Sequence, residues 1–545
     1  MAYPPEPPAT SPGGPDPSGP PMRRRNPVLI GVLVGVLVFA LSAAGFAGWR
    51  AISDDDPSAT STGDPSTPAA TPSPSPTAAL PGTDPQLARF YDQKLSWHDC
   101  GRDECAKLTV PLDYDNPAAA AIKLAVLKVP AQGHRIGSLV VNPGGPGGSG
   151  VSYAAAGSLQ FGAPLSDAYD IVGFDPRGVG QSDPLSCIDT KQLDTLIAFD
   201  PDPDTQAERN EMDRLIHGFG QGCLDNSGDL ARHMSTKEVA RDMDILRAAL
   251  GEAKLDYLGA SYGTFIGATY ADLFPTHVGR FVLDGAIDPS LTNEQLSLAQ
   301  AHGFETALRA YVKDCVDQGG CFLGNSVDAG IARIQAFFGQ VEKTPLPTGE
   351  SRQLTEGLAM LGVWMPLYVK EWWPQLSQGL KQAMEDGSGS TLLGLADTYT
   401  SRGPSGYSDN SMEALYAVNC LDHDDYVPTS QVPSHFAEFE KASPTFGRAF
   451  SFALSTCASW PVQSGQHTVA LHAAGAPPIV VVGTTRDPAT PLRWAQALSK
   501  ELDSGRLITR DGDGHTAFQR GNTCVNDAVE LWLIKGVVPK ADLHC

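Results

Sequence analysis

The stretch that decides the fold runs from residue 255 to residue 264 and reads Leu-Asp-Tyr-Leu-Gly-Ala-Ser-Tyr-Gly-Thr. An apolar run typical of a strand stops at Gly259, and residues 259–263 form the pattern Gly-x-Ser-x-Gly. In such a nucleophile elbow the two glycines remove Cβ atoms where the chain turns sharply from strand to helix, which leaves the serine hydroxyl exposed in a strained conformation. The pattern therefore predicts that Ser261 is a nucleophile.

The flanking sequence supports this interpretation, because a five-residue pattern alone also occurs by chance in turns with an idle serine. Upstream, Ser235 to Glu238 has the form of a capping box, and an apolar helix face follows until Gly251. Downstream, residues 265–274 can continue as the helix after the elbow. Helix, strand, elbow and helix thus follow in the expected order.

Further out, predicted strands alternate with helices. Two segments rich in β-branched residues predict an antiparallel edge of the sheet, and later apolar runs predict buried strands. This alternation is typical of a doubly wound, mostly parallel α/β sheet, which here predicts the α/β-hydrolase fold. The edge strands are expected at 106–112 and 122–129, and the later strands at 138–141, 169–174, 255–260, 280–283, 478–482 and 506–509.

A long, mainly helical stretch separates the strand at 280–283 from the penultimate strand at 478–482. An insertion at this point predicts a helical cap, which we place at 291–460, over the strand ends where ligands bind in open α/β sheets. The core is then expected to consist of residues 87–290 and 461–545. Within the cap, Trp364, Trp372 and Trp373 are interpreted as core residues in preference to a substrate platform.

The N-terminal part differs in composition from the rest. Residues 1–27 predict a disordered cytoplasmic tail that includes Arg23-Arg-Arg, and residues 28–49 carry no charge over a length that can cross a bilayer as a single helix. By the positive-inside rule, all later residues are expected outside the cytoplasm. We expect an uncleaved membrane anchor, with cleavage near residues 43–47 as the alternative. Residues 50–86, rich in Ser, Thr, Pro and Ala, predict a spacer.

All 10 cysteines follow the predicted membrane segment. An even number confined to the exported part predicts disulfide bonds. Connectivity cannot be read from sequence, but pairing between neighbours would close short loops in every case: 100 with 105, 187 with 223, 315 with 321, 420 with 457 and 524 with 545. No Cys-x-x-Cys pair occurs, and His98 beside Cys100 and Cys105 is an incomplete ligand set, so the cysteines do not predict a metal site. No cofactor is expected. The net charge of −23 argues against nucleic acid or anionic lipid as a ligand.

A glycine-rich loop, Asn142-Pro-Gly-Gly-Pro-Gly-Gly-Ser-Gly150, directly follows the strand at 138–141. So many glycines expose main-chain N-H groups, which can stabilise an oxyanion in this position of the fold. We expect the backbone N-H groups of Gly145 and Tyr262 to form the oxyanion hole. The polar turn after the strand at 169–174 is interpreted as structural, and Arg177 is given no catalytic role.

A serine hydroxyl needs an imidazole to accept its proton and a carboxylate to orient that imidazole. In this fold the partners follow the serine in the order acid, then histidine. His515 lies in a glycine-bounded loop after the last predicted strand, whereas the other histidines after Ser261 fall in helix, cap or tail patterns. Asp487 follows the penultimate strand and is the predicted acid, with Asp284 and Asp288 as competitors one strand earlier.

Five motifs together resemble the actinobacterial tripeptidyl aminopeptidase family, which comprises exported α/β-hydrolase serine peptidases related to prolyl aminopeptidases. The resemblance covers about residues 90–545 and implies removal of short peptides from free N-termini, with Ser261, Asp487 and His515 as the triad. A preference for a single N-terminal proline is not implied, because this chain has Pro143 where prolyl aminopeptidases have histidine. The motifs are Asn142-Pro-Gly-Gly-Pro-Gly, Phe174-Asp-Pro-Arg-Gly, Gly259-Ala-Ser-Tyr-Gly-Thr, Thr485-Arg-Asp-Pro-Ala-Thr-Pro and Gly512-Asp-Gly-His-Thr.

Three functions compete. The first is a serine aminopeptidase, the second an esterase or lipase that acts on cell-envelope lipids with the same triad, and the third a catalytically silent, membrane-tethered binding protein, which the complete triad disfavours. An aminopeptidase needs an anion for the substrate ammonium, and Asp422 or Asp424 in the cap is the candidate, with a solvated acidic loop as the alternative. A peptide or a small ester is accordingly the expected substrate.

Overall fold

The computed structural model describes residues 85–462, 464 and 469–545, which all belong to the unit Thr71–Cys545. The predicted cytoplasmic tail, the predicted membrane helix at 28–49 and nearly all of the predicted spacer lie outside the described residues. Among the residues that are described, no helix has the length and apolar character needed to cross a membrane.

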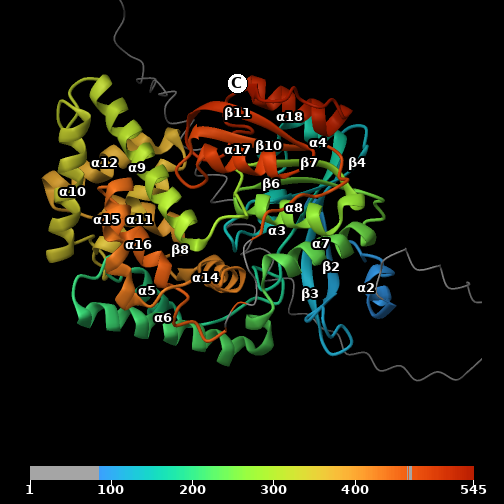
Figure 1. The fold of residues 1–545 in the computed structure, drawn as a ribbon, viewed down its shortest axis with the longest axis horizontal. Coiled ribbons are helices and arrows are strands. Elements are labelled where there is room, and N and C mark those ends of the chain that lie inside the picture. The colour runs from blue at the N-terminus through green and yellow to red at the C-terminus, as the bar shows by residue number, and fades with distance from the viewer. Residues whose placement is uncertain (1–84, 463, 465–468) are drawn as a thin grey trace, which may run out of the picture. The chain divides into compact units, whose positions relative to one another are not determined.

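A 10-stranded sheet forms the centre of the unit, in the order β1-β2-β3-β5-β4-β6-β7-β10-β11-β12 (Figure 1). The pairs β1/β2, β2/β3 and β3/β5 are antiparallel, and every later pair is parallel. The predicted antiparallel edge and mostly parallel sheet are thus confirmed. The strands are β1 His98–Cys100, β2 Asp103–Pro111, β3 Ala121–Val129, β4 Gly137–Asn142, β5 Tyr169–Phe174, β6 Leu255–Ala260, β7 Val278–Asp284, β10 Ile479–Arg486, β11 Gly505–Asp513 and β12 Leu543–His544.

Helices cover both faces of the sheet. Because successive residues of a strand point to opposite faces, Leu139 and Val141 pack with one group of helices while Val140 packs with the other. Burial on both faces explains why the central strands are almost continuously apolar. One face is covered by α3 Gly150–Ala155, α4 Ser158–Ala168 and α18 Thr523–Lys535, and the other by α7 Thr236–Ala249, α8 Tyr262–Leu273 and α17 Leu492–Glu501.

The cap has a hydrophobic core of its own, separate from the two clusters on the sheet. Trp373 is buried in it and Trp372 packs against it from a partly buried position, in agreement with their interpretation as core residues. Trp364 also packs against this core but lines the catalytic cavity as well, so it is not a core residue alone. The cap elements are α9 Asn293–Asp317, α10 Val327–Lys343, α11 Glu356–Leu367, α12 Trp373–Lys381, α13 Ser390–Thr400, β8 Arg402–Gly403, β9 Gly406–Tyr407, α14 Ser411–Asp422, α15 Phe436–Ala442 and α16 Gly447–Phe452.

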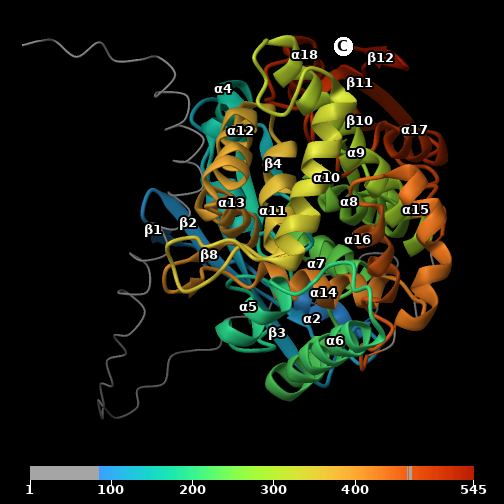
Figure 2. The same ribbon diagram turned by 90° about the vertical axis from the view of Figure 1, so that its left-hand side faces the viewer.

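A second insertion in the chain, between β5 and β6, lies beside the cap. Its helices are α5 (Thr190–Ile197) and α6 (Gln206–Ser227), and α6 runs next to α14 in Figures 1 and 2, where the rings of Phe219 and Tyr416 meet edge to face. The sequence offered little periodicity here, because glycines stand beside Ile216, Phe219 and Cys223 on the packing face of α6. A Cβ at Gly220 would lie 2.9 Å from the Trp460 ring, and one at Gly222 would lie 2.3 Å from the Cys187 carbonyl oxygen.

Short helical segments complete the described chain. They are α2 Ala88–Tyr91, the 3-10 turns Pro85–Leu87, Gly228–Arg232, Pro275–His277, Lys370–Trp372, Thr429–His435 and Ala453–Ser455, and one π turn at Gln382–Asp386.

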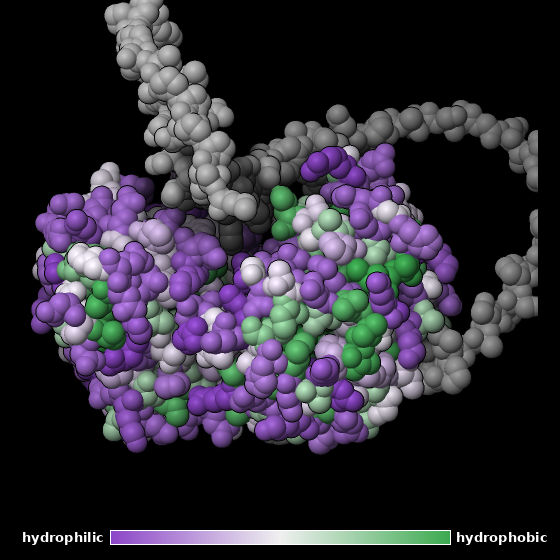
Figure 3. Space-filling model, turned by 90° about the horizontal axis from the view of Figure 1, so that it is seen from above, coloured by the Kyte–Doolittle hydropathy of each residue, from purple (hydrophilic) through white to green (hydrophobic). Residues whose placement is uncertain are grey.

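Five disulfides join each cysteine to its neighbour in sequence, as the loop-closing arrangement predicts. Such bonds form and persist in oxidising compartments, so the described domain is an extracytoplasmic one. The face in Figure 3 is covered mainly by hydrophilic side chains with smaller apolar patches between them, in keeping with the strongly acidic composition.

Candidate active site

Ser261 lies at the turn between β6 and α8, with φ 57° and ψ −127°. The turn is tightly packed: a Cβ at Gly259 would lie 2.5 Å from the Gly263 carbonyl oxygen, and one at Gly263 would lie 2.9 Å from the Asn142 carbonyl oxygen. Only glycine fits these two positions without displacing main-chain atoms. The strained turn that Gly-x-Ser-x-Gly predicts is therefore present.

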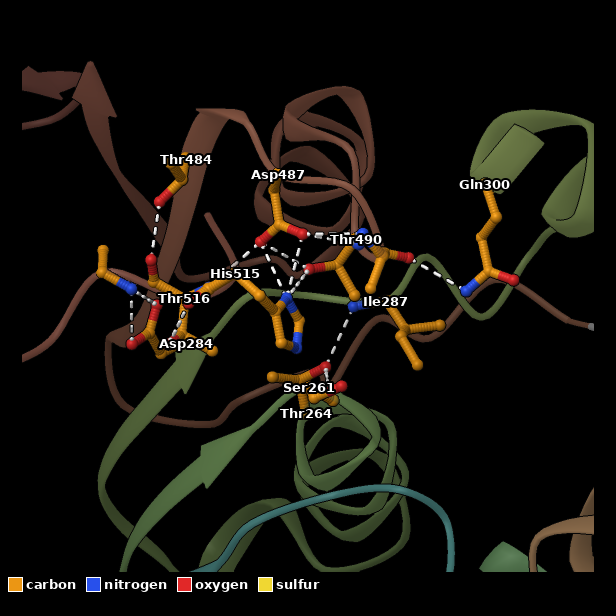
Figure 4. Close-up of polar contacts among 12 residues, drawn as sticks. Ser261, Thr264, Asp284, Ile287, Gln300, Thr484, Asp487, Thr490, His515 and Thr516 are labelled. Carbon is orange, nitrogen blue, oxygen red and sulfur yellow. Dashed lines mark hydrogen bonds and ion pairs between the residues drawn. The ribbon is translucent and has the colours of Figure 1, made fainter. Parts of the chain in front are cut away.

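His515 stands between Ser261 and Asp487 (Figure 4). Its Nδ1 lies 2.9 Å from both carboxylate oxygens of Asp487. Its Nε2 faces Ser261, is buried, and has no hydrogen-bond partner among the residues that the structure describes. A donor on Nδ1 leaves Nε2 as the acceptor, which is the tautomer that a general base needs.

The Asp487 carboxylate is buried and held by the loop that follows β10. It accepts hydrogen bonds from the main-chain N-H of Ala489 at 3.0 Å and of Thr490 at 2.8 Å, and from the Thr516 N-H at 3.1 Å. The Thr490 hydroxyl donates to the same carboxylate at 3.0 Å and lies 3.2 Å from His515 Nδ1. Sequence reasoning missed Thr490, although its place three residues after Asp487 is typical of a turn that an aspartate caps.

The two competing acids have other partners. Asp284 is buried at the end of β7 and accepts the N-H groups of Ala517 at 3.0 Å and Phe518 at 2.8 Å, so that it fixes the loop that carries His515. Burial raises the pKa of Asp284. Asp288 accepts the N-H and the hydroxyl of Ser290, as in a capped turn.

The cap contacts His515 directly. The His515 N-H donates to the carbonyl oxygen of Tyr368 at 2.8 Å, and the two rings meet edge to face at 5.4 Å. Tyr368 ends α11. Gly514 has φ 92°, and a Cβ there would lie 2.8 Å from the same carbonyl oxygen. This contact could not be predicted from the sequence, because it joins main-chain atoms of two segments that are distant in sequence and no motif marks it.

The predicted oxyanion residues lie together. A Cβ at Gly144 would be 2.8 Å from both the Ser261 Cβ and the Tyr262 nitrogen, which shows how closely the glycine-rich loop approaches the elbow. Tyr262 begins α8, and the first N-H groups of a helix have no partner within it. Gly145 and Tyr262 both line the cavity beside the elbow.

That cavity has a volume of about 470 Å³ and lies between the elbow, the cap and the helices of the insertion between β5 and β6. Its wall is mainly apolar and aromatic, with Phe265, Met360, Trp364 and Phe450 among the lining residues. Three aspartates, Asp200, Asp213 and Asp288, also line it, whereas no lysine or arginine does so in the part of the chain that the structure describes. The cavity therefore favours a ligand that carries positive charge and apolar groups.

Asp422 does not line this cavity, and neither does Asp424. The Asp422 carboxylate is buried and accepts the N-H of Thr236 at 2.8 Å and its hydroxyl at 2.5 Å. Burial raises the pKa of Asp422 to about 7. Because the side chain is turned towards the start of α7, the structure does not bring it together with Ser261 and His515. Asp424 is exposed.

A serine on a strained elbow, a histidine bonded to a buried carboxylate and an adjoining cavity define a serine hydrolase of the α/β-hydrolase fold. Comparison with known proteins agrees. A family model described as the alpha/beta hydrolase fold matches residues 137–329, and one described as TAP-like protein matches residues 443–545.

Three curated relatives narrow the class. Serine protease Hip1 of Mycobacterium tuberculosis is 37% identical over 83% of this chain and 91% of its own length. Carboxylesterase B of the same species is 34% identical over 81% of this chain and 86% of its own length. Tripeptidyl aminopeptidase of Streptomyces lividans is 32% identical over 83% of this chain and 86% of its own length. This chain belongs to the tripeptidyl aminopeptidase family of α/β-hydrolases, and it is a serine hydrolase of the peptidase type.

Proposed function

We propose that this protein is a membrane-anchored aminopeptidase that removes short peptides, foremost tripeptides, from free N-termini outside the cytoplasm. The single observation that carries the proposal is the cavity beside Ser261, which is lined by three aspartates and by no lysine or arginine among its described residues. A free N-terminus is positively charged and a C-terminus is negative, so this lining selects the amino end of a peptide.

The proposed mechanism begins with attack of the Ser261 hydroxyl oxygen on the scissile carbonyl carbon. His515 Nε2 takes the hydroxyl proton, and Asp487 stabilises the imidazolium through Nδ1-H. Collapse of the tetrahedral intermediate breaks the carbon–nitrogen bond, and His515 returns the proton to the leaving amine. Water then attacks the acyl-enzyme with the same histidine as base, which releases the short peptide and restores Ser261.

Stabilisation of the oxyanion is assigned to the N-H groups of Gly145 and Tyr262. Donors that are fixed in place before reaction require no reorganisation, and loss of one such donor typically lowers turnover about 100- to 1,000-fold. The close approach of Gly144 to Ser261 and Tyr262 supports this assignment, because it places the glycine-rich loop directly against the elbow.

An esterase with the same triad is the second candidate. The mainly apolar cavity wall favours it, as does the similarity to a protein named carboxylesterase B. Ester and amide hydrolysis share the acyl-enzyme chemistry, so the distinction lies in what the cavity binds.

A panel of mono-, di- and tripeptidyl chromogenic amides, each free or acetylated at the N-terminus, set against acyl esters of several lengths, tests the proposal. The aminopeptidase is expected to prefer the free tripeptidyl amide and to lose most of its kcat/KM on acetylation. Equal kcat/KM for free and acetylated amides, together with faster ester hydrolysis, would favour the esterase instead.

The membrane anchor at 28–49 is part of the proposal and has a test of its own. Protease treatment of intact cells is expected to cut within the spacer at 50–86 and to release an active domain. Activity recovered only from the cytosol, without a cell-bound fraction, would contradict both anchoring and export.

A further inference from the structure

Three carboxylates lie close together, and one of them lines the wall of the cavity. Asp200 and Asp202 belong to the segment between α5 and α6, and Glu356 is the first residue of α11 in the cap. One carboxylate oxygen of each residue lies within 4.8 Å of those of the other two. Asp200 lines the cavity that also touches Gly145 and Tyr262, so the cluster reaches the space beside the nucleophile through this residue.

Glu356 lacks a partner for one of its carboxylate oxygens. The residue is 7% exposed, and its Oε2 is buried without a hydrogen bond in the described part of the chain. A buried carboxylate in this state is costly unless a cation or a donor comes to it. The orphan oxygen is an observation separate from the clustering, and it points to a ligand that carries hydrogen-bond donors.

The cluster is short of positive charge. Burial, and then the neighbouring carboxylates, raise the pKa of Asp202 to about 8 and that of Glu356 to about 9. Arg448 is the nearby cation, but its guanidinium is bonded to Asp204 and its Nε stays 3.9 Å from Asp202. Without substrate these two carboxyl groups therefore hold protons near neutral pH, and a cationic ligand would take the place of those protons.

We propose that Asp200, Asp202 and Glu356 bind the α-ammonium group of the substrate's free N-terminus. The inference rests on the proposed aminopeptidase function and names the site that confers it. An ammonium group has three N-H donors, and acceptors about 2.8 Å from its nitrogen in tetrahedral directions lie about 4.6 Å apart, which is within the 4.8 Å limit on the separation of these oxygens. With the N-terminus held there, the span to Ser261 sets which peptide bond is cut and hence the length of the released peptide.

Carboxylate oxygens at this spacing also suit a divalent cation such as Ca²⁺. The position of Asp200 in the wall of the catalytic cavity favours the ammonium group, because a substrate that reaches Tyr262 occupies the same space. Binding of a divalent cation at the three carboxylates is the alternative outcome of the test.

The test compares kcat/KM for a free and an N-acetylated tripeptidyl chromogenic amide in wild type, Asp200→Asn and Glu356→Gln. Each variant removes one carboxylate that would pair with the substrate ammonium group. We expect the ratio of kcat/KM for the free substrate to kcat/KM for the acetylated substrate to fall about 30-fold or more, with little change in kcat/KM for the acetylated substrate. Glu305→Gln is the matched control: Glu305 is another buried cap carboxylate, bonded to Ser443 and Thr445 and absent from the cavity lining, so the ratio should stay at the wild-type value.

A wild-type ratio retained in both cluster variants would overturn the site while leaving the aminopeptidase intact. Equal kcat/KM for the free and the acetylated amide in the wild type would instead contradict the proposed aminopeptidase function itself. If Glu356→Gln does not fold, Asp200→Asn carries the test, because Asp200 is only partly buried. In a parallel experiment, Ca²⁺ alone should not raise the Tm of the wild type. A metal site would be identified, and the proposal overturned, by two results together. Ca²⁺ would raise the Tm of the wild type but not of Glu356→Gln, and dialysis against EDTA would leave the ratio of kcat/KM for the free and the acetylated amide unchanged.

Discussion

At Ser261 the backbone conformation costs about 1 to 3 kcal/mol for a residue with a Cβ atom, and neighbouring groups hold it in place. The Ser261 N-H donates to the Asp284 carbonyl oxygen at 2.9 Å, and the Thr264 hydroxyl donates to the Ser261 carbonyl oxygen at 2.6 Å. These bonds use the main chain of the serine and leave its hydroxyl to face His515. Asp284 thus supports both the nucleophile, through its carbonyl group, and the histidine loop, through its carboxylate.

Substitutions in the proposed triad should not be additive, because its members act as a unit. We expect Ser261→Ala and His515→Ala each to lower kcat by about 10⁶-fold and the Ser261→Ala/His515→Ala double variant to lower it no further. Asp487→Ala should cost somewhat less. Steady-state kinetics on the tripeptidyl amide measure these losses, and circular dichroism checks the fold; a double variant whose loss is the product of the single losses would speak against a shared mechanism.

Glu356 should make stability depend on pH. Burial, followed by the charges of Asp202 and Asp200, raises its pKa from 4.5 to about 9. The folded state keeps a proton that the unfolded chain releases near pH 4.5, so the wild type loses stability as the pH rises from about 5 to about 9. Because Glu356→Gln cannot titrate, its Tm should rise relative to wild type over that interval in thermal melts. A difference that is constant with pH would contradict the raised pKa.

At the scale of elements, the contact between the end of α11 and the loop after β11 ties the cap to the catalytic histidine. Gly514→Ala places a Cβ 2.8 Å from the Tyr368 carbonyl oxygen, at a residue whose φ is 92°. We expect kcat to fall at least about tenfold, because a shift of about 1 Å at the base is enough to disturb proton transfer. Gly521→Ala is the control, since φ there is 75° but nothing lies within 4 Å of the added Cβ. Similar losses in both variants would assign the effect to backbone strain alone.

The elements differ in how well the sequence predicts them. β6, α7 and α8 were predictable because an apolar run, a capping box and an elbow, respectively, mark them. The positions of Asp487 and His515 after successive strands, β10 and β11, followed from the order of a doubly wound sheet. The role of Thr490, in contrast, depends on a turn whose hydrogen bonds carry no sequence signal beyond its residue types.

At the scale of the whole domain, two insertions distant in sequence build one cavity. The insertion after β7 supplies Trp364 and Phe450, and the one after β5 supplies Asp200 and Met212. The contribution of the segment after β5 could not be predicted, because glycines interrupt the apolar pattern of its packing face and because contacts between insertions are tertiary. For the same reason the sequence drew attention to Asp422 in the cap and missed Asp200.

Disulfides across the longest loops should matter most for stability. Cys187 and Cys223 are buried and close a loop with a sequence separation of 36, whereas Cys100 and Cys105 are 5 apart. Loop-closure entropy predicts about 4 kcal/mol for the first bond and about 2 kcal/mol for the second. Replacement of both cysteines of a pair by serine should therefore lower the free energy of unfolding more at 187/223 than at 100/105. Equal losses in urea titrations would contradict this ranking.

The proposed release of tripeptides from free N-termini is tested most directly by mass spectrometry of the products formed from an unblocked peptide of about ten residues. We expect the N-terminal tripeptide and the matching shortened peptide to appear first, and both to be absent with the acetylated peptide and with Ser261→Ala. Fragments cut from the interior, equal cleavage of the acetylated peptide, or hydrolysis of acyl esters with the peptide left whole would contradict the aminopeptidase.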